Sequence, residues 1–477
     1  MLRFILSFRN ALQPVNRLSP ETISLIARCA MESHHEDATA IIPLTHVCRY
    51  WRDSIVSTPE NWASISSQNE DMAVVSLERA KAAPLKISFN MFRDAKNRPS
   101  FPKIIIPYIQ NTGTLEVYHI PSTEEFTNAF PNFPRSMPAL RSLTLSPYID
   151  IDIDWDESTD LFEGFVPALE FLSLEYIPLY PSLLGLRTLT EVIIQHPQFD
   201  LHLDTLLDFL EANHLLESAT LEISFLESSL RTSKRRTAMK NQLRRLSIDS
   251  WKVVDIQTLV SSIPLRTGSH LTIGTTYRKI RLKETLPDIS TAHLSNPQSP
   301  TFFELKNQKA FRSILLRGAG GTFSFQSDST PEEPFEDFSE LPLTKVREVR
   351  LLSFGTDSLV IPAFPLSSFP LLETLAVEQL GCGNILGIIS SLLSNPSSSP
   401  ALKTLAFLNC NLSEEFMEGL TKFASERQKT ATSTWLYRVL IVHEDGIFPQ
   451  AASIRRLRDY VKVVDAQMGN RLPRDLM

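Results

Sequence analysis

From about residue 84 onward, one short pattern of apolar and polar positions recurs along the chain: an apolar residue, two others, an apolar residue, one other, and an apolar residue. Its fullest instance runs from Leu402 to Leu412, with Cys410 at a further position that takes asparagine or cysteine. Alternation of apolar and polar residues predicts a strand with one buried face. Between these strands, apolar residues at helical spacing predict helices, for example at 206–216, 385–393 and 414–428. Strand and helix are therefore expected to alternate.

Weaker copies keep the first six positions of the pattern. They lie at 115–120, 140–145, 169–174, 189–194, 216–221, 243–248, 311–316, 346–351, 372–377 and 436–441. Most follow one another at or near the period of the leucine-rich repeat, about 20–29 residues, and the chain resembles that family. The longest step, between residues 246 and 314, is expected to contain a degenerate copy at 271–273 and an insertion.

This resemblance implies an irregular α/β solenoid over residues 66–477. Its parallel strands would line the concave face, and helices or loops would form the convex face. Each repeat leaves an apolar flank that only its neighbours can cover, so the repeats are expected to stack. Apolar residues at helical spacing near the end of the chain predict a capping helix near 451–466.

The beginning of the chain follows a helical pattern instead. Ser19 is a suitable N-cap, Pro20 suits the first helical position, and a stripe of apolar residues follows at helical spacing. Residues 34–37 break the stripe and are expected to form a loop. A second helix is predicted to begin near Pro43 and to end at Thr58, because the residue before a proline is disfavoured in a helix. Two such short helices need a partner or a following domain to cover their apolar sides.

Within this helical part, residues 42–53 and 57–62, with 18–21 upstream, resemble the F-box. The motif is carried by Val47-Cys48-Arg49-x-Trp51, followed by Ser57-Thr58-Pro59-x-x-Trp62. The resemblance implies a helical module over 18–65, preceded by an arm at 1–17, that binds a Skp-type adaptor and through it a cullin. Under this reading the residues that contact the adaptor are Leu18, Pro20, Ile23, Leu44, Val47, Cys48 and Trp51.

Composition narrows the class of partner and the compartment. The 477 residues are 43% hydrophobic and 21% charged, which is ordinary for a globular protein, and the net charge of −7 argues against nucleic-acid binding. The four cysteines are scattered, which fits a reducing compartment rather than a disulfide framework or a zinc site. No stretch approaches the roughly 20 apolar residues that span a bilayer, and the apolar start of the chain is too short for a signal peptide. We expect a cytoplasmic or nuclear protein with no membrane partner.

Four segments have some features of a chemical site and lack others. The acidic run at 150–157 lacks the glycine and the glutamate of a calcium loop, so an acidic loop at the rim of a repeat is favoured. The glycines at 381–387 have the wrong spacing for a dinucleotide loop, and residues 34–37 lack a separated second pair of metal ligands. The basic cluster at 234–245 fits a nuclear-import signal, a contact for an acidic partner or a solvated loop. We therefore expect no enzyme activity, no cofactor and no metal.

Polar residues that directly follow core strands suggest a binding surface. They are Glu175, Gln195, Glu222, Asp249 and Glu378. In stacked repeats these positions align, so an acidic stripe is expected to bind a basic or polar peptide, although a purely solubilising role fits as well.

These patterns lead to one main hypothesis and one alternative. The main hypothesis is a substrate-recognition subunit of a Skp–cullin–F-box ubiquitin ligase that holds an unidentified protein substrate. The alternative is a leucine-rich-repeat scaffold outside any ligase, whose first helices only cap the repeats. Departures of the first helix from the F-box pattern at Thr22 and Ala27 keep this alternative open.

Overall fold

The protein has a mixed α/β fold with a large, mostly parallel sheet, and contacts divide it into two compact units, Met1–Thr232 and Ser233–Met477. The structure is a computed structural model. It describes residues 13–33, 38–91, 100–129, 137–148, 168–179, 181–196, 201–223, 226–227, 243–250, 252–263, 265, 268–275, 300–308, 312–318, 321–327, 343–354, 366–379, 382–394, 399–410, 412–429, 435–443 and 449–468. Several segments discussed above therefore lie outside the described residues: 1–12 of the arm, the loop at 34–37, the acidic run at 150–157, and 234–240 of the basic cluster.

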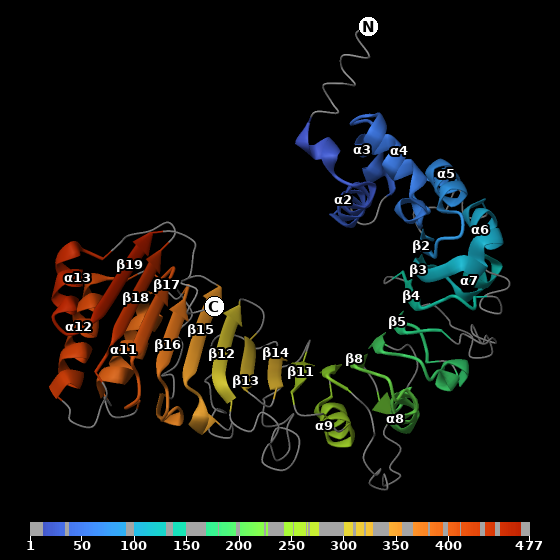
Figure 1. Ribbon diagram of the computed structural model, residues 1–477. Coiled ribbons are helices and arrows are strands. Elements are labelled where there is room, and N and C mark those ends of the chain that lie inside the picture. The colour runs from blue at the N-terminus through green and yellow to red at the C-terminus, as the bar shows by residue number, and fades with distance from the viewer. Residues whose placement is uncertain are drawn as a thin grey trace. The chain divides into compact units, whose positions relative to one another are not determined.

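The first unit begins with short helices (Figure 1). They are η1 (Pro14–Arg17), α2 (Pro20–Ser33), η2 (Ala38–Ile41), α3 (Ile42–Thr45), α4 (Arg49–Ser57) and η3 (Pro59–Trp62). As predicted, Ser19 caps α2, since its hydroxyl accepts a hydrogen bond from the Thr22 amide at 3.3 Å. The second predicted helix is wrong as one continuous element, because the chain leaves the helical conformation at Cys48 (φ −163°). Residues 45–48 are all weak helix formers, which explains the break between α3 and α4.

Parallel strands make up the sheet of the first unit. In chain order they are β1 (Ser64–Ser66), β2 (Leu85–Asn90), β3 (Thr112–Ile120), β4 (Ser142–Pro147), β5 (Phe171–Glu175), β6 (Glu191–Gln195) and β8 (Ser218–Ile223), each paired with the next. A separate pair joins β7 (Leu201–His202) to β9 (Leu226–Glu227). The connections contain α5 (Glu70–Ala80), α6 (Ser100–Ile105), η4 (Ile106–Asn111), α7 (Thr123–Ala129), η5 (Pro181–Gly185) and α8 (Leu203–Ala212).

Register aligns equivalent residues of these strands into rows. Two rows are buried and apolar: Ile87, Leu115, Leu143, Leu172, Val192 and Ala219 form one, and Phe89, Val117, Leu145, Leu174, Ile194 and Leu221 form the other. The alternate residues form what we call the polar face of the first unit. The predicted phase of the first copy is wrong, because Leu115, rather than Tyr118, aligns with Leu143. Both phases satisfy the apolar spacing, since Tyr118 and Ile120 can also fill apolar positions.

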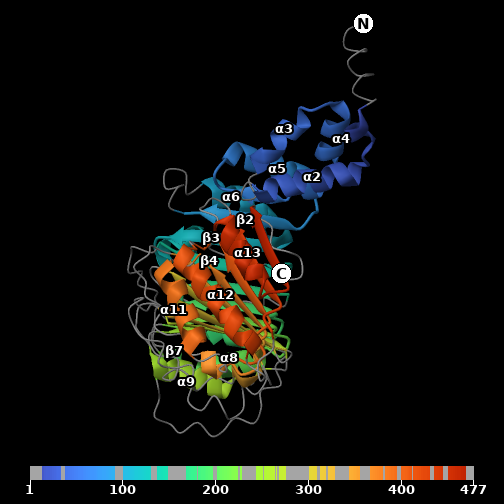
Figure 2. The same ribbon diagram turned by 90° about the vertical axis from the view of Figure 1, so that its left-hand side faces the viewer.

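The second unit contains a longer run of strands. They are β10 (Arg245–Ser250), β11 (Ser269–Thr275), β12 (Pro300–Gln308), β13 (Arg312–Gly318), β14 (Gly321–Ser327), β15 (Glu348–Phe354), β16 (Thr374–Glu378), β17 (Thr404–Leu408), β18 (Arg438–His443) and β19 (Val463–Met468). The helical elements are α9 (Val253–Ser262), η7 (Leu343–Lys345), η8 (Leu366–Ser368), α11 (Cys382–Ser394), α12 (Glu414–Lys429) and α13 (Ala451–Arg458). Figure 2 shows α11, α12 and α13 side by side on one face of the last strands.

Two predictions for the second unit need correction. The copy predicted at 311–316 lies on β13, which is antiparallel to both β12 and β14, whereas β11 pairs with β14 and β12 with β15 in parallel. An apolar pattern does not encode strand direction, so this segment could not be distinguished from a repeat. The capping helix predicted to reach residue 466 ends at Arg458, and β19 follows it. Valines at 461, 463 and 464 favour a strand there.

Strands β16–β18 of the large sheet, in the second unit, carry buried apolar residues on both faces. Phe407 contacts Phe416 of α12 with ring centroids 4.9 Å apart, so its face is the one that the helices cover. On the other face, Ala376, Ala406, Leu408, Leu440 and Val442 form a second buried cluster. Strands buried on both faces read as continuous apolar runs, as in Leu405-Ala406-Phe407-Leu408.

Candidate interaction surfaces

Three exposed apolar side chains lie within residues 42–50, which include α3 and the start of α4. Ile42 is 41% exposed, Val47 is 49% exposed and Tyr50 is 38% exposed. The Tyr50 hydroxyl donates a hydrogen bond to the Leu18 carbonyl at 2.7 Å, which fixes the ring beside the start of α2. We call Ile42, Val47 and Tyr50 the N-terminal apolar patch. Exposed apolar groups in one small region are a common feature of protein interaction sites.

The residues predicted to contact an adaptor divide into two groups. Pro20 and Val47 are exposed, and Leu18, Leu44 and Cys48 are half-buried. Ile23 and Trp51 are buried inside the helical module, so they support its core rather than its surface. Sequence reasoning missed Ile42 and Tyr50 as surface residues. Their positions on either side of the α3–α4 break place them outside the helical stripe that predicted the others.

A buried hydrogen-bond network fixes the helices beneath the patch. Asn61 accepts a hydrogen bond from the Ser24 hydroxyl at 2.8 Å and donates to the Ile55 carbonyl at 3.2 Å. The Trp62 indole donates to the same carbonyl at 3.0 Å, and the Arg79 guanidinium lies over its ring at 4.2 Å. These contacts connect α2, α4, η3 and α5. A satisfied polar network of this kind fixes one arrangement of the helices.

On the polar face of the first unit, residues at or near the C-terminal ends of the strands form a row, and most of their side chains can form hydrogen bonds. Along the strands this row runs Asn90, Tyr118, Ser146, Glu175, Gln195 and Glu222. Three of the predicted binding residues, Glu175, Gln195 and Glu222, therefore lie on adjacent strands. The Ser146 hydroxyl donates to the Glu175 carboxylate, and the Gln195 amide donates to Glu222 at 2.8 Å. We call these six residues the terminal row.

Rings follow the terminal row at the next position of two strands. The Tyr176 and His196 rings stack at 4.8 Å, and His196 Nε2 lies 2.7 Å from a Glu222 oxygen. The hydrogen bond from His196 is the main cause that lowers the pKa of Glu222, with burial acting in the opposite direction. The His196 imidazole thus favours the charged form of the Glu222 carboxylate. The terminal row and the residues that follow it therefore combine carboxylates with aromatic rings.

The same backbone conformation recurs at or just after the ends of strands in both units. His119, Tyr176, His196, Gln379 and Asn409 all have positive φ values between 46° and 55°. In four of them the amide donates to the carbonyl at the end of the neighbouring strand, as in the 2.7 Å bond from Asn409 to Val442. Residues other than glycine seldom adopt this conformation, so its recurrence shows that these strand ends share one local geometry.

The other two predicted stripe residues have different neighbours. Asp249, on β10, is in register with Gly274, where the absence of a side chain leaves room for its carboxylate. Glu378, on β16, is flanked in register by Leu352 and Leu408. Gly274, Leu352 and Leu408 carry no acidic group, so none of these three neighbours extends an acidic stripe. In the first unit, Glu175 and Glu222 lie in the same row, on either side of Gln195.

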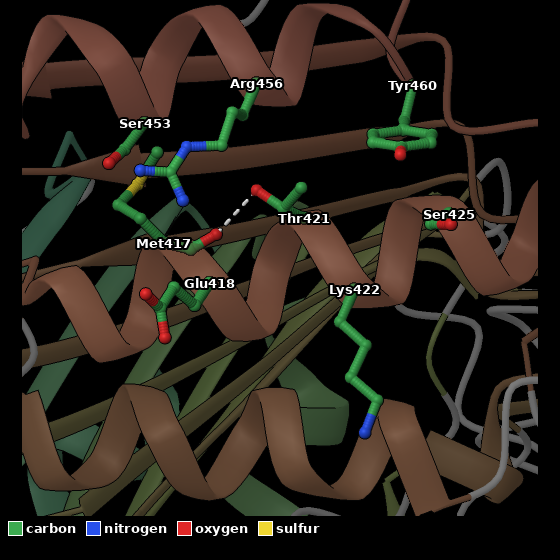
Figure 3. Close-up of a pocket in the computed structure, with 8 residues that line it drawn as sticks. All are labelled: Met417, Glu418, Thr421, Lys422, Ser425, Ser453, Arg456 and Tyr460. Atoms are coloured by element: carbon green, nitrogen blue, oxygen red, sulfur yellow. Dashed lines mark hydrogen bonds between the residues drawn. The ribbon is translucent and has the colours of Figure 1, made fainter.

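A groove of about 290 Å³ lies between α12 and α13 in the second unit (Figure 3). Its polar lining includes Glu418 and Lys422 from α12 and Arg456 from α13. Figure 3 shows Arg456 lying over Met417, whereas Lys422 points away from it. The charged groups do not converge on one point, so the groove is a seam between packed helices rather than a ligand site.

In the part of the chain that the structure describes, no cluster of three or more histidine, cysteine or acidic side chains could hold a metal ion. No described helix has both the length and the apolar character needed to cross a membrane. In comparisons with known proteins, no family model matches this chain, and no curated protein matches it either.

Proposed function

We propose that the protein is the substrate-recognition subunit of a Skp–cullin–F-box ubiquitin ligase. In this proposal residues 18–65 are an F-box that docks a Skp-type adaptor. The observation that carries it is the N-terminal apolar patch, in which Val47 of the F-box-like motif is 49% exposed. When a partner covers such side chains and removes them from water, the free energy of the system falls, which favours binding.

The arrangement of the strands supports the second half of the proposal. Parallel pairing, in-register apolar rows and the recurring left-handed residue are all expected of leucine-rich repeats that stack on one another. The repeats would then hold a protein substrate while the adaptor and cullin bring in the ubiquitin-transfer machinery. The protein itself would supply proximity rather than chemistry, with no cofactor, and would act in the cytoplasm or nucleus.

Co-purification with a Skp-type adaptor tests the proposal directly. We expect a stoichiometric complex with the wild type and at least about tenfold weaker binding for Val47→Glu, because a carboxylate would be buried at the interface. Val74→Glu is the matched control, since Val74 is also exposed (41%) but lies on α5, outside the motif. Circular dichroism checks that both variants remain folded.

The same experiment distinguishes the ligase subunit from the alternative function, a scaffold that binds no adaptor. A wild type that stays monomeric and well folded in the presence of the adaptor would contradict the ligase proposal. It would favour a leucine-rich-repeat scaffold that acts outside a ubiquitin ligase. Equal losses of binding for Val47→Glu and Val74→Glu would mean that the loss is not specific to the F-box-like motif.

For the substrate side, we propose that the terminal row binds a basic or polar segment. Glu175→Lys should reduce the binding of a labelled arginine-rich peptide about tenfold, because it reverses one of the two carboxylate charges of the terminal row. Glu217→Lys is the control, as Glu217 is exposed just before β8 and lies off the polar face. Fluorescence anisotropy measures both. Unchanged affinity for Glu175→Lys would leave these carboxylates with a solubilising role only.

A further inference from the structure

The residues that immediately precede β15–β19 form a ladder along one edge of the second unit. In strand order they are Arg347, Glu373, Lys403, Tyr437 and Lys462, and the strands that they introduce are in register. Neighbouring positions are therefore separated by about one strand spacing, roughly 4.8 Å. We call this set the strand-start ladder. It lies outside the proposed adaptor and substrate surfaces.

Side chains along the ladder contact one another in two groups, Arg347–Glu373–Lys403 and Tyr437–Lys462. The Glu373 carboxylate lies 3.4 Å from Arg347 and 3.1 Å from Lys403, so one negative charge sits between two positive ones. The Lys462 ammonium lies 5.0 Å from the Tyr437 ring centroid, within range of a cation–π contact. With three cations and one anion, the ladder is net positive in a chain whose net charge is −7.

Two exposed aromatic rings lie on the segment just before β18, and one of them, Tyr437, contacts Lys462. Trp435 is 67% exposed and Tyr437 is 48% exposed, whereas Leu436 between them is buried. In an extended segment such alternation puts both rings on the same side. Tryptophan and tyrosine are the residue types that most often anchor protein interfaces, and an indole so open to water has much area left to bury.

We propose that the strand-start ladder, with Trp435, binds an acidic segment of a partner protein that carries at least one apolar side chain. Lys403 and Lys462 match the carboxylates, while Trp435 and Tyr437 match the apolar side chain. A nucleic acid fits less well, because binding its phosphates requires more concentrated positive charge than this ladder holds.

Fluorescence anisotropy on the full-length protein tests this surface. The probe is a short labelled peptide that alternates glutamate with leucine and contains one phenylalanine. We expect wild-type binding that falls with added salt, and a loss of about tenfold or more for Trp435→Ala and for Lys462→Glu. The matched control is Val254→Ala, since Val254 is 61% exposed on α9 and should not affect binding.

Three outcomes would overturn the proposal. The first is no wild-type binding at millimolar protein concentration, with both rings and both lysines intact. The second is an equal loss for Val254→Ala, and the third is tighter binding of a single-stranded oligonucleotide than of the acidic peptide. All substituted residues are exposed, so the variants should fold, and circular dichroism verifies this. None of these results depends on whether the N-terminal module binds an adaptor.

Discussion

At the scale of single residues, Glu222 shows how one side chain serves both stability and surface charge. Its carboxylate receives hydrogen bonds from Gln195 at 2.8 Å and from His196 at 2.7 Å. These partners lower its pKa in the folded state. A carboxyl group with a lowered folded pKa stabilises the fold above its unfolded pKa, and this contribution disappears as the pH falls through the folded value.

Because the pKa of Glu222 is lowered in the folded state, the effect of Glu222→Gln on stability should depend on pH. Near neutral pH we expect the variant to be less stable than the wild type by about 1 kcal/mol, since a partly exposed charge-assisted bond is lost. The difference should shrink to near zero once Glu222 is protonated in the wild type. Urea unfolding at several pH values measures it. A difference that stays constant on acidification would mean that ionisation of Glu222 plays no part.

At the scale of elements, a buried arginine connects α12 to the segment before β17. Arg427 is completely buried and donates to the carbonyls of Ser399, Pro400 and Leu402 at 3.0–3.2 Å. Burial lowers its pKa, and its guanidinium also lies 5.5 Å from the centroid of the Phe423 ring. Only the forked geometry of arginine can reach three such acceptors at once.

Removing this connection should be costly. We expect Arg427→Ala to lower the free energy of unfolding by about 3–5 kcal/mol, because it leaves buried carbonyls unpaired and a cavity behind. Arg427→Lys should recover only part of that loss. Chemical denaturation compares them with Arg455→Ala, which removes an exposed arginine from α13. A loss below 1 kcal/mol for Arg427→Ala, about that of a surface substitution, would refute this role.

The elements also show where sequence patterns lose information. Apolar alternation located most strands, including the degenerate β11, because burial of one face imposes it directly. It did not reveal that β13 runs antiparallel to β12 and β14, since alternation of apolar residues is the same for both strand directions. The break between α3 and α4 was also missed, although it exposes Val47 beside Tyr50. For the N-terminal apolar patch, the sequence therefore identified the segment from its residue types but not which of its side chains are exposed.

At the scale of the whole molecule, two compact units share one chain, and each has its own apolar rows. In stacked structures, each strand depends mainly on its neighbours for cover. We expect Leu172→Ala, in the buried row of β5, to cost about 2–5 kcal/mol. Hydrogen exchange should then rise in β4–β6 and remain unchanged in β15–β19. Faster exchange throughout the chain would mean that the two units unfold as one.

Some whole-molecule features were not accessible from the sequence. The in-register alignment of Glu175, Gln195 and Glu222 was anticipated, because equal spacing within repeats puts equivalent residues on adjacent strands. The neighbours of Asp249 and Glu378 were not, since they depend on which residues the adjacent strands supply. The charged and aromatic strand-start ladder was missed for the same reason.

The spacing of side chains along the terminal row limits how an extended peptide can bind across it. Neighbouring strands are about 4.8 Å apart, whereas side chains on one side of an extended peptide recur about every 6.7 Å. The two spacings come into phase only after three strand intervals, where they agree to within about 1 Å. Asn90 on β2 and Glu175 on β5 are one such pair. An extended peptide lying across the terminal row would therefore contact it at only a few matched side chains, and the spacing between those side chains would decide whether it binds.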